Sequence, residues 1–204
     1  TLKVLAGFVG LLLVASLPAG AVSLSRSFRA NVDQTVQQSQ LAVDATREAF
    51  ASGQPSREAL IQATQRFQSA EASLRQANAM VLGLANAIPQ ARQAYQGGQA
   101  LLQAGEKSTR AAQILSDGMA RAWSIPVHYP DERLQALELY LDEAAPFIQQ
   151  ARQHVDSVQV DALPESIRPK VDEVHSALVQ GEASLNDLRT LMYLGMMILG
   201  HSES

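Results

Sequence analysis

The sequence predicts an all-α protein, with an N-terminal transmembrane helix followed by an antiparallel helical bundle of coiled-coil-like hairpins. The run Val4–Val22 contains no charged side chain, and about 20 apolar residues in a helix span the roughly 30 Å of a bilayer's hydrocarbon core. Beyond this run, apolar residues recur at alternating intervals of three and four, the period of a coiled-coil seam. We therefore divide the chain into an anchor, residues 1–23, and a helical bundle or stalk, residues 24–200.

Composition agrees with long helices that meet along thin seams. Of the 204 residues 47% are hydrophobic, but only 5% are aromatic, which suits small-residue helix contacts better than a thick globular core. The chain has no cysteine, so disulfides are excluded. A net charge of −4 gives no reason to expect nucleic acid as a partner. Residues 1–130 carry a net charge of +4 and residues 131–204 a net charge of −8, so the two parts can attract each other or leave an acidic face for a partner.

The apolar run has a second interpretation. Ala19-Gly20-Ala21 has the small-x-small pattern of a signal-peptidase site, but the run is present in this chain, and we interpret it as an anchor. Lys3 precedes it, whereas Arg26 and Arg29 follow it, so these charges alone do not favour an external bundle. The small-residue pairs Ala6/Gly10 and Ala15/Ala19 would allow two such anchors to approach closely in lipid.

Prolines and glycines divide the bundle into helices. The anchor helix is expected to continue to about Ser52, and Gly53-Gln54-Pro55 ends it, so that Ser56 caps a second helix. A third helix is expected at Gln99–Trp123, after a turn between Ile88 and Gly98, although the heptad phase also allows one kinked rod through Pro89. A fourth helix is expected after Asp131, which caps it, and a fifth is expected to begin near Pro169. The inward stripes of these four helices include Leu60, Ala63, Phe67, Ala70 and Leu74; Leu102, Leu115 and Met119; Leu134, Leu141, Ala144 and Val155; and Val171, Val174, Leu178, Leu185, Leu188 and Met192.

Two segments are candidate interaction sites. Trp123, His128 and Tyr129 gather around the proline-rich segment 124–130, where they either pin the loop onto the bundle or form a contact surface. Residues 191–199 are apolar on every face yet too short to cross a membrane, so we expect the loop, another subunit or further protein to cover them. The candidate interaction residues of this second segment are Leu191, Met192, Tyr193, Met196 and Met197.

No residues predict catalysis, a cofactor or a metal. The four histidines, His128, His154, His175 and His201, lack the spacing of metal ligands on helices. The carboxylates Glu138, Asp142 and Glu143 are typical of a solvated helix face. We predict that the protein is not an enzyme.

A family resemblance supports this interpretation. The chain combines one membrane helix, alanine-rich helices with a proline-interrupted turn at Ala87-Ile88-Pro89, a turn at Leu163-Pro164, and a last helix ending in Ile198-Leu199-Gly200-His201. This layout resembles the N-terminal part of the bacterial surface proteins grouped as the domain of unknown function 4012 family. The resemblance implies an anchored, extracytoplasmic protein and supplies no catalytic residue.

Two functions follow as hypotheses. The first is a non-enzymatic, membrane-anchored stalk or assembly module of the bacterial cell envelope, with membrane lipid, other envelope proteins or further copies of itself as partners. The alternative is a ligand-sensing bundle of a chemoreceptor-like receptor. That architecture needs a second full-length membrane helix, and residues 191–199 are too few to form one.

Overall fold

The structure is a computed structural model that describes residues 34–35, 37–42, 44–45, 48, 56–85, 89–163 and 168–201. Four long helices dominate this part of the chain, and no strand occurs in it. They are α3 (Arg57–Ala85), α4 (Pro89–Ser124), α5 (Pro130–Asp156) and α6 (Arg168–His201), with the short 3-10 helix η2 (Val160–Ala162) before α6. The predicted all-α bundle is confirmed for the described residues.

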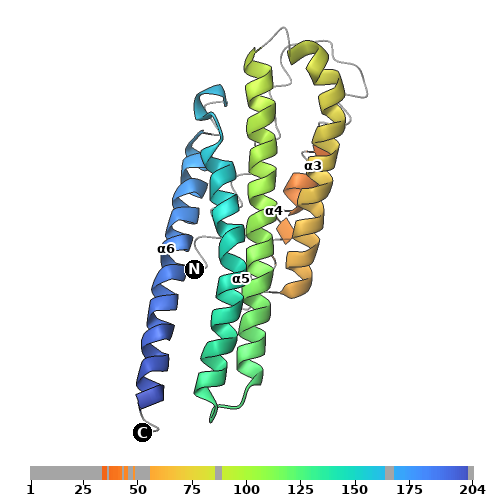
Figure 1. Cartoon of the computed structure of the whole chain (residues 1–204). Coiled ribbons are helices and arrows are strands. Elements are labelled where there is room, and N and C mark those ends of the chain that lie inside the picture. The colour runs from red at the N-terminus through yellow and green to blue at the C-terminus, as the bar shows by residue number, and fades with distance from the viewer. Residues whose placement is uncertain are drawn as a thin grey trace.

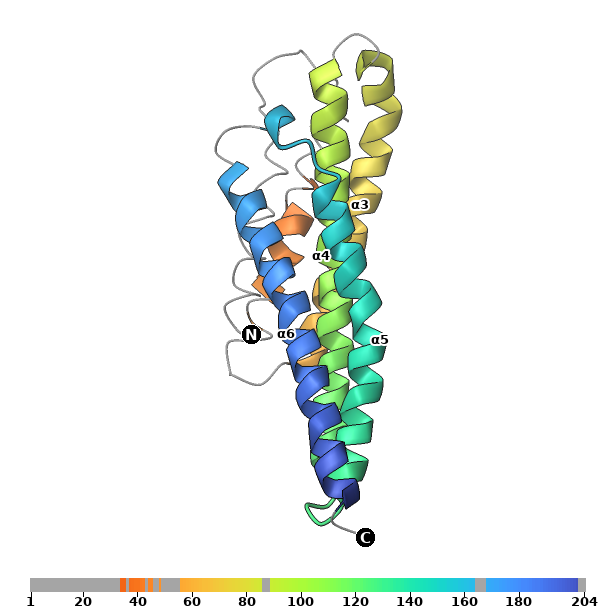
Figure 2. The same ribbon diagram turned by 60° about the vertical axis from the view of Figure 1, so that its left-hand side comes forward.

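The helices form an elongated antiparallel row in which each packs against the next. α4 lies between α3 and α5, and α6 packs on the far side of α5 (Figures 1 and 2). The α4–α5 turn and the end of α6 lie at the lower end in Figure 1, whereas α3 meets α4 at the upper end. The lower end of α3 stops well above the lower ends of α4 and α5.

α3 and α4 approach closely because glycine faces a large side chain. A Cβ atom added to Gly105 would lie 2.5 Å from the Phe67 ring, and Phe67 is only 1% exposed. Gly118 plays the same part on the other side of α4, where an added Cβ would lie 2.5 Å from Cβ of Tyr140 on α5. α4 is therefore the central helix, with small residues where its neighbours place aromatic rings.

Most predicted seam positions are buried. Leu74 is 6% exposed and Leu141 3%. Other buried members of the predicted stripes are Leu60, Ala63, Phe67 and Ala70 on α3, Leu102 on α4, Ala144, Ala151 and Val155 on α5, and Val171, Val174, Leu178, Leu185 and Met192 on α6. The period of the apolar residues therefore identified the interior correctly.

The third helix begins ten residues earlier than predicted. Pro89 is the first residue of α4, a position that proline favours because its missing N–H has no intrahelical partner there. Gly97 and Gly98 lie inside the helix instead of in a turn. At Gly97 the absence of a side chain serves packing, because an added Cβ would lie 3.2 Å from Leu163. α3 and α4 pack antiparallel, so the kinked-rod alternative is excluded.

Two positions predicted to face inward are exposed, and one predicted cap is wrong. Met119 is 40% exposed, because α3 begins at Arg57, which pairs with Asp117, and leaves the last turns of α4 uncovered. Leu188 is 43% exposed on α6, a helix at the edge of the row. α5 begins at Pro130 after Tyr129, so Asp131 is a first-turn residue and not the cap.

The predicted anchor Val4–Val22 lies outside the described residues. Within the described part of the chain, no helix is both long and apolar enough to cross a membrane. The anchor therefore stays a prediction.

Core substitutions test the register of the seams. Leu74→Asp and Leu141→Asp should each lower the free energy of unfolding by about 3–5 kcal/mol, because each buries an unpaired carboxylate. Gln65→Asp and Gln153→Asp, at exposed positions of the same two helices, should change it by less than about 0.5 kcal/mol. Urea unfolding followed by circular dichroism measures all four variants. Equal losses in both pairs would show that the assigned register is wrong.

Candidate functional site

The loop between α4 and α5 presents apolar and aromatic side chains at the lower end of the bundle. Trp123 is 75% exposed, Val127 77% and Tyr129 46%. His128 is exposed too, and its ring centroid lies 4.4 Å from that of Tyr129. The sequence left two alternatives, a loop whose side chains pin it to the bundle or a contact surface. The large exposed fractions of these side chains favour the contact surface.

Arg133 holds this loop in place from the first turns of α5. Its Nε donates a hydrogen bond to the Ile125 carbonyl at 2.7 Å, and its Nη2 donates to the same oxygen. Its guanidinium carbon lies 5.7 Å from the centroid of the Trp123 ring, within the range of a cation–π contact. The Tyr129 N–H also donates to the Pro126 carbonyl at 3.1 Å. The loop is therefore pinned through its backbone while its large side chains stay exposed.

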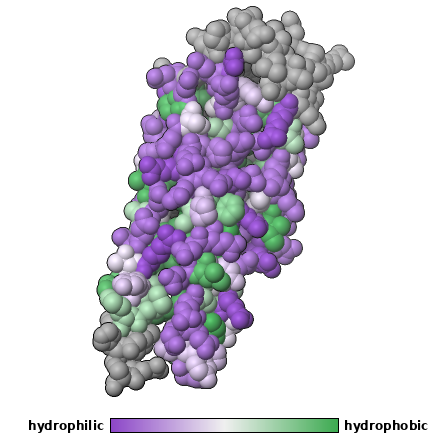
Figure 3. Space-filling model, viewed as in Figure 1, coloured by the Kyte–Doolittle hydropathy of each residue, from purple (hydrophilic) through white to green (hydrophobic). Residues whose placement is uncertain are grey.

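The end of α6 is the second apolar surface, and the α4–α5 loop leaves it largely uncovered. Leu191 is 65% exposed, Tyr193 60%, Leu194 45% and Met197 44%. Met196 is partly buried. Figure 3 shows apolar side chains gathered toward this end of the molecule. Of the three covers expected from the sequence, the loop does not bury these side chains, and the other two, another subunit or further protein, stay predictions.

Met192 differs from its neighbours. It is 4% exposed and packs in one core cluster with Leu141 and Leu185. Of the candidate residues on α6, Met192 therefore belongs to the interior, whereas Leu191 and Tyr193 face solvent.

A polar network joins the first turns of α3 to the facing part of α4. Gln113 Nε2 donates to the Leu60 carbonyl at 2.9 Å and to the Thr64 hydroxyl at 2.8 Å. The Thr64 hydroxyl lies 3.1 Å from that of Thr109, which can donate to the Gly105 carbonyl at 3.0 Å. Because buried polar groups need partners, this network penalises any sliding of α3 along α4.

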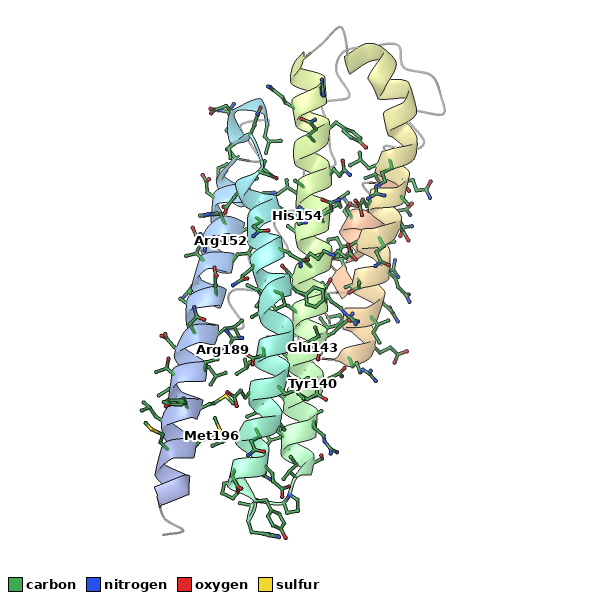
Figure 4. The ribbon with its side chains drawn as sticks, in the orientation of Figure 1. Tyr140, Glu143, Arg152, His154, Arg189 and Met196 are labelled. Atoms are coloured by element: carbon green, nitrogen blue, oxygen red, sulfur yellow. The ribbon has the colours of Figure 1, made fainter. Side chains whose placement is uncertain are left out.

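Two arginine–carboxylate ion pairs and one histidine–carboxylate contact join α5 to α6 along their length. Arg152 contacts Glu182 at 2.6 Å, and His175 contacts Asp156 at 2.9 Å. Nearer the lower end, Arg189 contacts Asp142 at 2.5 Å. Figure 4 shows Arg152 and Arg189 between the two helices. The hydrogen bond that Arg152 donates to the Glu182 carboxylate raises the pKa of Arg152, so this arginine stays charged. Asp142, one of the carboxylates interpreted from the sequence as part of a solvated helix face, therefore pairs with Arg189.

Two partly buried groups in the upper half have shifted pKa values. Burial lowers the pKa of His154, and the positive charge of Lys107 lowers it further against the weaker opposing effects of Glu71 and Glu106. Burial also raises the pKa of Tyr95, whose hydroxyl has no hydrogen-bond partner. In the described part of the chain, no three His, Asp or Glu side chains gather as a metal site would require.

Sequence reasoning missed Arg133 and Gln113 because their partners are backbone carbonyls. Which carbonyl a side chain reaches depends on how two helices are placed, and residue spacing does not record that. The only available signal was weak, an arginine three residues after a proline that ends a loop.

Removing Arg133 should loosen the loop. In Arg133→Met the Ile125 carbonyl loses both donors, so we expect a loss of about 1 kcal/mol in unfolding free energy. Trp123 is the only tryptophan, so its fluorescence anisotropy should fall and proteolysis within residues 124–130 should accelerate. Arg121→Met, a change at a neighbouring exposed arginine, is the control. Unchanged anisotropy in Arg133→Met would contradict the pinning role.

His154 should make the fold sensitive to acid. Because its pKa is lower in the folded chain, the unfolded chain takes up the proton first, and stability falls as the pH drops through about 6.5. This contribution is fully present above that pH. Urea midpoints at about pH 7.5 and about pH 5 should differ less in His154→Gln than in the wild type. His128→Gln, at an exposed histidine, should keep the wild-type difference, and an unaltered difference in His154→Gln would refute the assignment.

Comparison with known proteins gives no relative. No family model, no curated protein and no solved structure matches this chain.

Proposed function

We propose that this protein is a non-enzymatic, membrane-anchored helical stalk that serves as an interaction or assembly module of the bacterial cell envelope. One observation carries the proposal: a rigid bundle exposes Trp123, Val127 and the apolar end of α6 together at one end. Exposed aromatic side chains on a fixed frame are typical anchors of protein interfaces, because little freedom is lost when they are buried.

The position in the envelope rests on the sequence. The charge-free run Val4–Val22 is long enough to cross a bilayer. The resemblance to the domain of unknown function 4012 family favours a bundle outside the cytoplasm. In this arrangement, the lower end in Figure 1 is the one that meets a partner.

The interior supports a structural role. Gln113 and Thr109 hold α4 in register, and the ionisable groups Asp142, Asp156 and Glu182 pair across α5 and α6. Each of these contacts fixes one helix against another. In a stalk, helices that cannot slide past one another keep the exposed end at a fixed place relative to the rest of the bundle.

The alternative, a ligand-sensing bundle, is favoured by a different observation. The hydroxyls of Tyr95 and Ser108 are buried and have no hydrogen-bond partner, and unpaired buried hydroxyls are groups that a small polar ligand could satisfy. A sensor of this kind would also need a second membrane helix. Identification of such a span in the full-length gene would favour the sensor over the stalk.

Flotation with liposomes tests the anchor. The intact chain should rise with neutral phosphatidylcholine vesicles, and it should need detergent for extraction. The double change Leu11→Arg and Leu13→Arg should reduce flotation strongly, because each arginine at the centre of a span costs about 2.5–3.5 kcal/mol. Leu139→Arg, at an exposed leucine of α5, is the matched control. Flotation that persists in the double variant would contradict an anchor at this run.

A further inference from the structure

The seam of α4 that faces α3 continues beyond the point where α3 begins. Two sets of positions, each repeating every seven residues, form this seam. The first set is Tyr95, Leu102, Thr109, Ser116 and Trp123, and the second is Gly98, Gly105, Ala112 and Met119. Tyr95 and Leu102 belong to one core cluster with Phe67 of α3, and the Thr109 hydroxyl lies 3.1 Å from that of Thr64. At the lower end, the Arg57–Asp117 ion pair marks the first residue of α3. Met119 and Trp123 therefore occupy seam positions with no part of α3 beside them, and they are 40% and 75% exposed.

α6 has the opposite feature, an apolar stripe that none of the other described helices covers. Among the described helices, α6 packs extensively only on α5. Met192 and Gly195 face α5, because Met192 is buried and an added Cβ at Gly195 would lie 3.4 Å from Leu134. Leu191 and Leu194, spaced three residues apart, are exposed on another side of the helix.

The two features lie at the same height in the bundle. Gly118 of α4 faces Tyr140 of α5, and Asp142, two residues further along α5, pairs with Arg189 of α6. Leu134 of α5 lies beside Gly195. α4 and α6 run in the same direction (Figure 1). In two copies standing side by side and parallel, Met119 and Trp123 of one would therefore be level with the end of α6 of the other.

Charge favours the same pairing. Residues 57–124, which include α3 and α4, carry 7 basic and 4 acidic side chains, a net charge of +3. Residues 130–201, which include α5 and α6, carry 5 basic and 12 acidic side chains, a net charge of −7. The α5–α6 sides of two copies would therefore repel each other, whereas the α5–α6 side of one copy and the α3–α4 side of another attract.

We propose that the end of α6 docks against the uncovered seam of α4 in a second copy of this chain. Leu191 and Leu194 would occupy the space beside Met119 and Trp123 that α3 leaves open, which continues the α3–α4 seam with a helix from the neighbour. The contact joins two different surfaces, so it repeats from copy to copy and builds a row or a closed ring. It rests on the proposed function in one respect, because anchoring in a common membrane supplies the parallel orientation.

Thiol cross-linking of mixed copies tests this contact in a chain that has no cysteine. The intact Met119→Cys and Leu194→Cys proteins, with tags of different size, are reconstituted together in phosphatidylcholine vesicles and treated with a short bis-maleimide. A product joining the two tags is expected to exceed either self-linked product several-fold. Leu139→Cys, an exposed leucine at a similar height on α5, should give little product with Met119→Cys.

Trp123 fluorescence provides a second measurement that needs no cysteine. Emission of the otherwise unaltered protein should shift to the blue as its density in the vesicles rises, and the double variant Leu191→Gln and Leu194→Gln should abolish the shift. Circular dichroism verifies that this variant folds. An unchanged shift in the double variant would overturn the proposal.

The cross-linking outcomes separate this inference from the anchor. Chains that float with vesicles but give no Met119–Leu194 product would overturn the contact and leave the anchor in place. The mixed product from chains that do not float would overturn the anchor and support the contact. Predominant self-linking of Leu194→Cys would overturn the proposed pairing, because it would show that two α6 helices meet.

Discussion

The close contact of α4 with the helices on both sides is the constraint on which the rest of the structure depends. Gly105 accepts the ring of Phe67 and Gly118 accepts that of Tyr140, each at a distance that leaves no room for a Cβ atom. Larger residues at these positions would force the helices apart and open cavities along both seams. Because these seams are thin, the polar contacts of Gln113 and Thr109 contribute to a register that apolar packing alone would specify weakly.

The α5–α6 pair is held together by a different balance of forces. Its interior contains Leu141, Leu185 and Met192, but its edge depends on ion pairs such as Arg152 with Glu182. These pairs are partly exposed, so each contributes little and salt weakens it. α6 is thus a helix at the edge of the described row, and apolar side chains on its lower half are exposed.

The sequence predicted the interior better than the helix ends. Leu74 and Leu141 are buried as their period required, because a three–four spacing can bury only one side of a helix. Pro89 was misplaced, since a proline that ends one helix and a proline that begins the next look alike in a sequence. Met119 and Leu188 carry the correct spacing, yet whether a neighbour reaches them depends on the length and position of another helix. At the candidate site, Trp123 and Tyr129 were found from composition, whereas Arg133 was not, because its role depends on the Ile125 carbonyl.

The unequal lengths of the helices link fold to function. α4 has 36 residues and α3 has 29, so a seam that begins beside Tyr95 extends past the start of α3 and ends at Trp123. A seam residue without a neighbour is costly in a monomer, because an apolar surface stays in water. Arg133 holds the backbone of the loop through the Ile125 carbonyl, and the Trp123 ring stays 75% exposed beside its guanidinium, which keeps that surface in one shape. A shape retained in the absence of a partner reduces the entropy lost on binding, and the exposed end of α4 is therefore better suited to association than to solvent.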